Sequence, residues 1–442
     1  MKNTRFLVYV TFLFFILSSH FVRIDARKHK KHKDIAPSSE TPNDDSGSAN
    51  TFSVTKYGAA GNGITDDTDA FSKAWTAACN SENSVMLVPS GTYLVNQITF
   101  SGDSCKSRMI FQVEGKIVAP SIGEFKAVSS DLAWLDFTKV NGLTIMGVGD
   151  AIIYGTGEGW WKSNKDTKPT ISKAIRVIGC DDVIVTGITI QDSQQAHLKF
   201  DNCNGVDAYG ITISSPPDSA NTDGIHLQGS QKVNLYEIKI ACGDDCISMQ
   251  TGSSGINITN VQCGPSHGIS IGSLGKDGSK ACVSDVTVTD SYIFKSDNGV
   301  RIKTWQGGLG SVKGVKFSNI KVDNVEIGVD INQHYCDGGD GCGGENSQAV
   351  AISDVTFDNI HGSFSLYSVN LVCSGNKPCE DITLSRINLT PLSTANLEPS
   401  CSNAYGPTDS TAHCLKKSGS SSSSSYYKSS DNDGGYGNTD TC

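Results

Sequence analysis

The chain of 442 residues is poor in long apolar runs, in paired Cys-x-x-Cys motifs and in positive charge. Only residues 6–17 form a long apolar run, so we expect a soluble mature protein with no membrane contact. Because no paired Cys-x-x-Cys motif occurs, we expect no zinc site, and nothing else suggests a bound metal. The formal net charge of −10 argues against a nucleic-acid-binding protein, although a local basic pocket can still bind an anionic substrate.

The N-terminal segment 1–26 has the composition of a secretory signal peptide. Lys2 and Arg5 precede an apolar run from Phe6 to Leu17, and small and polar residues follow up to Ala26. The run is short for a bilayer-spanning helix, so a membrane anchor is the less favoured alternative. We therefore expect a secreted, extracellular protein. Removal of residues 1–26, with three Lys/Arg and one Asp, takes the formal net charge to −12.

Composition divides the rest of the chain into three parts. Residues 27–50 begin with a basic run and continue with Pro, Ser, Asn and Asp, so we expect a linker that buries almost nothing. Residues 416–442 are dominated by Ser, Gly, Tyr and Asp and are expected to form a low-complexity tail. One ordered domain should therefore occupy residues 51–415.

Fifteen cysteines in an exported chain favour disulfide bonds. An odd number leaves at least one unpaired, and Cys442 at the end of the chain is the one expected. Two sequons, at Asn257 and Asn388, are candidate glycosylation sites. Short separations suggest four local disulfides: Cys246–Cys263, Cys336–Cys342, Cys373–Cys379 and Cys401–Cys414.

A short strand pattern recurs between residues 85 and 390. Each copy alternates apolar and polar residues like a half-buried strand, and no amphipathic stretch of helical length separates the copies. The intervals between copies vary, as expected for coils of one solenoid joined by loops of different lengths. The pattern predicts an all-β fold, a right-handed parallel β-helix. The copies begin at Val183, Val206, Val233, Ile256, Val286, Val315, Val355 and Ile382.

Only residues 67–79 predict a helix with any clarity. The apolar pairs Ala70-Phe71, Ala74-Trp75 and Ala78-Cys79 recur at helical spacing, and the preceding Asp and Thr residues favour a helix start. A solenoid must cover its open end, so we expect this helix to be the N-terminal cap.

A second repeat, between residues 221 and 303, places polar residues before an apolar pair. When the copies are aligned on that pair, Asp223, Asp245 and His267 are equivalent and evenly spaced, and Asn298 follows after a longer interval. Neighbouring strands lie about 4.8 Å apart, so these side chains should stack in one column. The copies are Asn221–Leu227, Gly243–Met249, Ser266–Ile271 and Asn298–Lys303.

Alternation within these copies predicts which side chains enter the core. The apolar residues should point inward, and the residues between them, including Ser248 and Ser270, should face solvent. Asp223 and Asp245 fall on the inward side, where an unpaired carboxylate is costly, so the backbone should bend just before each strand. Gly243 suits such a bend.

With that bend, Asp223, Asp244 and Asp245 meet in one cleft. Crowded carboxylates repel one another, which raises at least one pKa and separates their roles. This arrangement suits glycoside hydrolysis, in which one carboxylic acid protonates the leaving oxygen and a carboxylate activates water. The alternative, that each Asp caps a turn, is favoured for a single residue but not for three on consecutive coils.

Two cations follow on the same face. Arg301 and Lys303 alternate along one strand and are suited to hold a substrate carboxylate, unless they form a solvated edge. His267 is expected to orient the acid or the substrate, with a structural histidine as the alternative. Tyr335 follows the next strand and is expected to reach the groove, although aromatic packing would explain it equally well.

The four motifs Asn-Thr-Asp, Gly-Asp-Asp, Gly-x-x-His-Gly and Arg-Ile-Lys, in this order and spacing, resemble the polygalacturonases of glycoside hydrolase family 28. The resemblance covers roughly residues 51–415, and Val54–Gly58 is similar to plant members, whereas Ser266 stands where many relatives carry Gly. It implies a pectin-lyase-like solenoid and inversion at the anomeric carbon. It implies that Asp244 is the general acid and that Asp223 and Asp245 activate water. It also implies a Cys246–Cys263 disulfide, and a role in substrate binding or acid tuning for Asn221, His267, Arg301, Lys303 and Tyr335.

The resemblance thus implies a secreted enzyme that hydrolyses α-1,4-linked polygalacturonate in cell-wall pectin as a monomer without a cofactor. We expect endo rather than exo action, which depends on loops at the groove ends. Two alternatives remain. One is β-elimination of the pectate-lyase type, with calcium held by the carboxylates. The other is a non-catalytic pectin-binding protein, for which the two cations would suffice.

Overall fold

The computed structural model describes residues 50–106, 108–127, 133–163, 173–336, 348–393, 398–409, 413–417 and 442. The expected signal peptide, the linker before residue 50 and most of the expected tail lie outside these residues. The described residues belong to one compact unit. Within it, no helix combines the length and the apolar character required to cross a membrane.

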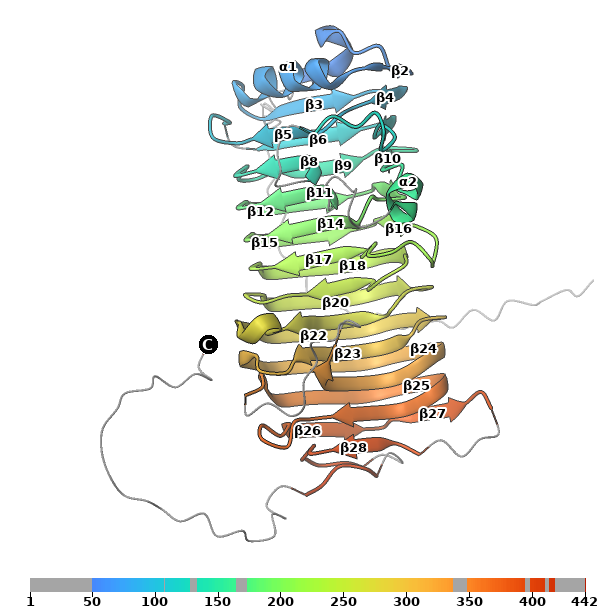
Figure 1. Cartoon of the computed structure of the whole chain (residues 1–442). Helices are drawn as coiled ribbons and strands as arrows, with labels where there is room; N and C mark the ends of the chain where they lie inside the picture. Colours follow the sequence, from blue (N-terminus) through green and yellow to red (C-terminus); the bar gives the residue numbers. More distant parts are fainter. Residues whose placement is uncertain are drawn as a thin grey trace, which may run out of the picture. The chain divides into compact units, whose positions relative to one another are not determined.

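The strands wind into the predicted right-handed parallel β-helix, whose coils stack along three ladders of strands (Figure 1). The ladder that carries the candidate site is called the site ladder here. In stacking order, its strands are β5 (Ile98–Ser101), β8 (Ala133–Thr138), β11 (Lys173–Ile178), β14 (Ala196–Asp201), β17 (Ile225–Gln228), β19 (Ile247–Met249), β21 (Ile269–Leu274), β23 (Asn298–Trp305), parts of β24 (Leu309–Tyr335) and β25 (Ala351–Val372), and β28 (Ser400–Ser402).

The other two ladders complete each coil, and the long strands β18, β20, β22, β24 and β25 run through more than one ladder. The second ladder contains β1 (Asn50–Ser53), β3 (Ser84–Val88), β6 (Met109–Val113), β9 (Thr144–Gly147), β12 (Asp181–Thr186), β15 (Asn204–Tyr209), β18 (Gln231–Ala241), β20 (Ser254–Cys263), β22 (Lys280–Phe294) and β26 (Glu380–Ser385). The third contains β2 (Asn62–Asp66), β4 (Thr92–Leu94), β7 (Lys116–Val118), β10 (Ile152–Tyr154), β13 (Thr189–Gln191), β16 (Thr212–Ser214) and β27 (Asn388–Pro391).

Strand pairing in the second ladder follows the repeat read from the sequence. Val183 pairs with Val206, Val206 with Val233, and Val233 with Ile256. The first apolar residue of each later copy continues this row to Ile382. All of these side chains are buried, because one in-register column of apolar residues fills the interior of the helix.

The predicted cap is helix α1 (Thr68–Cys79), which buries all six residues of the three apolar pairs. The Trp75 indole packs on Phe100 at 5.0 Å between ring centroids and donates a hydrogen bond to the Ser101 carbonyl (2.9 Å). Asp67 does not cap this helix; instead, its carboxylate accepts hydrogen bonds from the amides of Ala60 and Gly61 (2.6 and 3.2 Å), which tie down the glycine-rich turn.

The described residues contain a second helix, α2 (Glu158–Lys162), which the sequence did not indicate because it is too short to show a periodic apolar pattern. Short 3-10 turns also occur at Val54–Tyr57 and Lys276–Gly278.

Three of the four suggested disulfides are present, namely Cys246–Cys263, Cys373–Cys379 and Cys401–Cys414. Cys336 is disulfide-bonded, but Cys342 lies outside the described residues. The structure adds a Cys79–Cys105 bond between α1 and the loop after β5.

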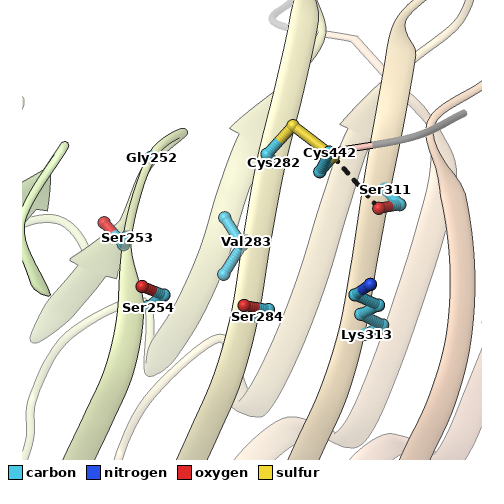
Figure 2. A pocket seen from close by; sticks show the side chains of 9 residues that line it. All are labelled: Gly252, Ser253, Ser254, Cys282, Val283, Ser284, Ser311, Lys313 and Cys442. Atoms are coloured by element: carbon cyan, nitrogen blue, oxygen red, sulfur yellow. Dashed lines mark hydrogen bonds between the residues drawn. A yellow bond between two sulfur atoms is a disulfide. The ribbon is translucent and has the colours of Figure 1, made fainter. Parts of the chain in front are cut away.

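The expectation that Cys442 is unpaired was wrong. Cys442 bonds to Cys282 on β22, and the Ser311 hydroxyl lies 3.1 Å from its sulfur at one side of a small pocket (Figure 2). The two cysteines are 160 residues apart, and the segment before Cys442 is of low complexity. No local pattern in the sequence therefore indicates this bond. The free cysteines among the described residues are Cys180, Cys203 and Cys242, all of them buried.

The two sequon asparagines lie on exposed strand positions. Asn257 is on β20, where its amide donates a hydrogen bond to the Asn234 side chain (3.2 Å). Asn388 begins β27. Glycosylation of either residue stays a prediction.

The burial of a side chain predicts how far its truncation lowers the free energy of unfolding. Ile258 on β20 is 1 % exposed, so Ile258→Ala should lower the free energy of unfolding by about 2–5 kcal/mol, since it removes buried methyl groups and leaves a cavity. Ile64 is 83 % exposed, and Ile64→Ala should change stability by no more than about 0.5 kcal/mol. Equilibrium urea unfolding measures both changes, and equal values for the two variants would contradict this account of the core.

Candidate active site

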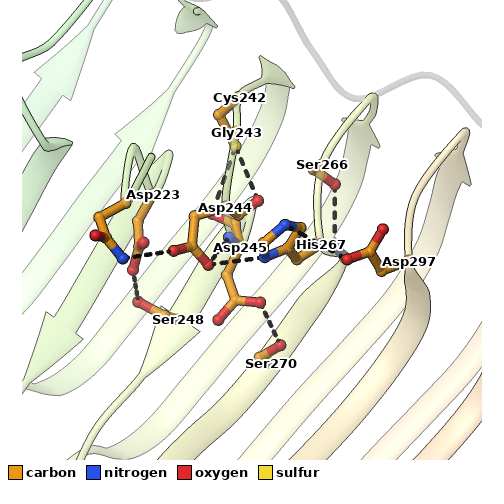
Figure 3. Close-up of polar contacts among 12 residues, drawn as sticks. Asp223, Cys242, Gly243, Asp244, Asp245, Ser248, Ser266, His267, Ser270 and Asp297 are labelled. Carbon is orange, nitrogen blue, oxygen red and sulfur yellow. Dashed lines mark hydrogen bonds and ion pairs between the residues drawn. The ribbon is translucent and has the colours of Figure 1, made fainter. Parts of the chain in front are cut away.

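The site ladder stacks the polar residues of successive coils side by side (Figure 3). Ile225 pairs with Ile247, and Ile247 pairs with Ile269, as the sequence alignment predicted. Backbone hydrogen bonds extend this pairing into the segments before the strands, where the Gly224 amide donates to the Asp245 carbonyl (2.9 Å). Equivalent residues of successive coils therefore become neighbours.

Two glycines let the turns between coils approach closely. A Cβ on Gly243 would lie 2.1 Å from the Ser219 carbonyl oxygen. A Cβ on Gly268, which has φ +96°, would lie 2.2 Å from the Asn298 carbonyl oxygen. The residues next to these glycines, Asp244 and His267, can therefore meet.

Asp245 is the most heavily bonded of the three carboxylates. Its Oδ1 accepts hydrogen bonds from Arg301 Nη2 (2.9 Å) and the Ser270 hydroxyl (2.7 Å), and its Oδ2 accepts one from Lys303 Nζ (2.8 Å). Asp245 is 2 % exposed and Lys303 6 % exposed, so these charges are nearly removed from water. These ion pairs hold the Asp245 carboxyl group and both cations in fixed positions.

Asp244 contacts His267 and Asn221. Its Oδ1 lies 3.1 Å from His267 Nδ1, and its Oδ2 accepts a hydrogen bond from the Asn221 amide (3.2 Å). The other ring nitrogen of His267 lies 3.4 Å from Asp297, so the imidazole bridges two carboxylates.

Asp223 is held by residues from two strands. The Ser248 hydroxyl on β19 donates a hydrogen bond to its Oδ2 (2.6 Å), and His226 Nδ1 lies 3.4 Å from the same oxygen. The side chains of all three carboxylates therefore converge on one wall of the site ladder (Figure 3).

The prediction that Ser248 and Ser270 face solvent was wrong. Both lie on the outward side of their strands, yet they are 1 % and 0 % exposed. The Ser248 hydroxyl donates to Asp223 and the Ser270 hydroxyl to Asp245, each a carboxylate of the preceding coil, and Arg301 also contacts Ser270. The alternation along a strand predicts whether a side chain points inward or outward, but not whether other side chains cover it.

Comparison with known proteins identifies the family of this chain. The family described as "Glycosyl hydrolases family 28" matches residues 79–414. A polygalacturonase from Persea americana is 43 % identical over 359 residues, which cover 80 % of this chain and 76 % of that protein. Polygalacturonase-2 from Solanum lycopersicum is 36 % identical over 393 residues, covering 86 % of this chain and 84 % of the relative. The chain belongs to the glycosyl hydrolases of family 28.

Solved structures support the same fold. The endo-xylogalacturonan hydrolase of Aspergillus tubingensis superposes with a TM-score of 0.70 at 23 % identity, over 80 % of this chain and 96 % of that one. A polygalacturonase from Erwinia carotovora superposes with a TM-score of 0.62 at 21 % identity, over 76 % and 94 % of the two chains. At these identities the likeness concerns the β-helix and not the substrate.

The pKa values in this family 28 site are driven apart by the surroundings of each group. Burial raises the pKa of Asp223, and the neighbouring charges of Asp244 and Asp245 add to the rise. Burial also raises the pKa of Asp244, but the hydrogen bond and charge of His267, with Lys303 and the Asp245 amide, outweigh it and leave that pKa lowered. The hydrogen bond to Asp244 raises the pKa of His267.

Tyr335 lies at the end of β24, close to the cations. Its ring centroid is 5.2 Å from Lys303 Nζ, a cation–π distance, and its ring packs edge-on against Trp305 at 5.5 Å. The ring contact with Trp305 is the aromatic packing given as the alternative, and a role of Tyr335 in substrate binding stays a prediction.

Three residues of the site were not identified from the sequence. His226 contacts Asp223, Asp297 contacts His267, and Asp330 lies on β24 next to Arg301. His226 and Asp297 stand inside or beside the aligned motifs, so proximity to them was an available signal. Asp330 belongs to the coil after Arg301, in a stretch that carries none of the motifs.

Asp244, Asp245 and His267 bring one ligand atom each within 4.8 Å of one another, which raises the question of a metal. Calcium prefers oxygen ligands that are free to coordinate, and an imidazole is not among them. Both oxygens of Asp245 are already bonded to cationic side chains. The donor set therefore does not fit the calcium of a lyase-type mechanism.

Proposed function

We propose that this family 28 chain hydrolyses the α-1,4-galacturonosyl linkages of polygalacturonate, the charged backbone of pectin. The observation that carries the proposal is a cluster of three carboxylates (Figure 3) beside two cations, the partly buried Arg301 and the buried Lys303. The curated relatives named above are polygalacturonases, which supports this substrate. We further propose that the protein acts as a secreted monomer in the extracellular cell wall, with endo action.

In this mechanism Asp244 donates a proton to the leaving oxygen. The pKa of Asp244 is lowered, whereas a general acid that holds its own proton before reaction needs a raised one. His267 resolves the difference, because its raised pKa lets it hold a proton 3.1 Å from Asp244 Oδ1. Substrate that covers Asp244 removes water from the carboxylate, which favours transfer of that proton onto it.

Asp223 and Asp245 orient and activate the attacking water on the opposite side of the sugar ring. Arg301 and Lys303 donate hydrogen bonds to Asp245 and fix the position of its carboxyl group beside the water. Asp223 has a raised pKa, so it becomes ionised at a higher pH than an ordinary Asp. Activity should therefore need a pH high enough to ionise Asp223 and low enough to keep His267 protonated.

The remaining polar residues bind the substrate. Arg301 Nη2 and Lys303 Nζ have further donor hydrogens beyond those bonded to Asp245, and an ammonium or guanidinium group is suited to a galacturonate carboxylate. The Asn221 amide is bonded to Asp244 and positions it toward the leaving oxygen. Tyr335 borders the Lys303 side of this surface.

Asp244→Asn should lower turnover of polygalacturonate by at least about 100-fold, the usual contribution of a general acid, while the fold stays intact. The matched control is Asp218→Asn, at an exposed acid in the loop before the site, which should stay within about twofold of wild type. An aryl oligogalacturonide has a leaving group that needs no protonation. Asp244→Asn should lose much less activity on it, whereas Asp223→Asn should lose activity on both substrates. Near-normal turnover of folded Asp244→Asn on polygalacturonate would exclude the assignment.

Hydrolysis should invert the anomeric configuration. Inverting enzymes usually hold acid and base about 6.5–9.5 Å apart, so that water enters between them and no covalent intermediate forms. One carboxylate oxygen of Asp244 lies within 4.8 Å of one of Asp245, which is shorter than that range, so we infer inversion from the family resemblance and not from the separation of this pair. Proton NMR of the first-formed reducing end decides the question, and retention would mean that a carboxylate acts as nucleophile. Ultraviolet absorbance of unsaturated products, or loss of activity with a chelator, would indicate β-elimination instead.

Arg301→Ala and Lys303→Ala should weaken action on polygalacturonate far more than on fully methyl-esterified pectin. Loss of one member of a desolvated charge pair costs about 2–5 kcal/mol. Only the charged polymer carries the galacturonate carboxylate that pairs with these cations, so only its binding should lose this energy. The measurement is kcat/KM on both polymers, with Lys313→Ala, an exposed lysine of β24, as control. Equal losses on both polymers would show that these cations do not recognise the carboxylate.

A further inference from the structure

A fourth buried carboxylate, Asp330, lies beside the cations on the side away from Asp245. It is on β24, directly paired with Arg301 of β23 on one side and with Asn370 of β25 on the other. It is 4 % exposed, so its charge, like that of Lys303, is hardly screened by water. Arg301 and Lys303 are therefore enclosed by two acids, one bonded to them and one on the adjacent strand.

We propose that Asp330 is a specificity-determining residue whose protonation state decides how strongly Arg301 and Lys303 attract a substrate carboxylate. With Asp245 and Asp330 both ionised, the two cations are matched by two anions and the group has no net charge. With Asp330 neutral, the same group carries one net positive charge facing the groove. The proposal rests on the function proposed above, in which these cations bind galacturonate.

The surroundings of Asp330 allow it to change between these forms. From β23 it faces Arg301 and Lys303; from β25 it faces the amide of Asn370, which donates a hydrogen bond to its Oδ1 (2.7 Å). The next outward residue of β24, Asn332, is uncharged and pairs with Lys303. Burial raises the pKa of Asp330 to about 6, although the Asn370 hydrogen bond and both cations lower it.

Binding of the substrate should weaken as the pH rises. Below a pH of about 6 Asp330 is neutral and the group is cationic, so binding of an anionic sugar is strongest there. As the pH rises through that value, Asp330 ionises, the net charge disappears and binding weakens. Bound galacturonate and ionised Asp330 compete for the same two cations, so each disfavours the other.

The test measures binding, so that its outcome does not depend on turnover. Isothermal titration calorimetry gives the Kd of trigalacturonate for an Asp244→Asn parent and for the Asp244→Asn/Asp330→Asn double variant at pH 5 and pH 7.5. At pH 7.5 the Asp330→Asn change should lower Kd about tenfold, the effect of removing one poorly screened charge a few ångströms from the ligand. At pH 5 it should change Kd by less than about twofold, because Asp330 is then already neutral. His267 titrates equally in parent and variant, so it does not affect the comparison.

Two further variants, each made in the same parent, separate this role from a structural one. Asp323→Asn removes the same charge from an exposed position of the same strand and should leave Kd unchanged at both pH values. Asn370→Ala removes the donor that stabilises ionised Asp330, so the pH at which binding weakens should rise while Kd at pH 5 is unchanged. The latter also provides a test if Asp330→Asn fails to fold.

The proposal is overturned if Asp330→Asn leaves the ratio of Kd values at the two pH values as in the parent. It is also overturned if trigalacturonate does not bind the parent at either pH. If trigalacturonate binds with the expected pH dependence but wild type does not cleave polygalacturonate, the inference holds and the proposed hydrolysis fails.

Discussion

In-register pairing of parallel strands, coil upon coil, is the constraint on which the rest of this structure depends. It places equivalent residues of successive coils about 4.8 Å apart, so a linear spacing becomes a column of side chains. Inside the β-helix the column consists of apolar side chains, as in the row from Val183 to Ile382. Outside, on the site ladder, the same rule stacks His226, Ser248, Ser270, Arg301 and Asp330.

Charge balance is the second constraint. Asp223, Asp244 and Asp245 would repel one another strongly if they stood alone in a site so poor in water. Each is stabilised by a different partner: Ser248 for Asp223, His267 for Asp244, and the two cations for Asp245. As a result the pKa of Asp223 is raised and that of Asp244 is lowered, so these two carboxylates differ in proton affinity.

The same balance explains how an acidic protein can bind an acidic polymer. A formal net charge of −10 repels polygalacturonate at long range, where salt also screens it. In the proposed mechanism the contact interaction depends on Arg301 and Lys303, which hydrogen bonds to Asp245 fix in position. In the further proposal, the attraction of these cations for a ligand also depends on whether Asp330 is ionised.

Strand periodicity and motif spacing were sufficient to predict the β-helix, its register, helix α1 and the meeting of Asp223, Asp245 and His267, because these follow from local repetition along the chain. No repeat in the sequence indicated the burial of Ser248 and Ser270, the Cys282–Cys442 bond or the short helix α2. The directions of the pKa shifts and the position of Asp330 beside Arg301 also required the folded chain. These features depend on which side chains cover one another and on how completely water is excluded, and only the packed coils decide both.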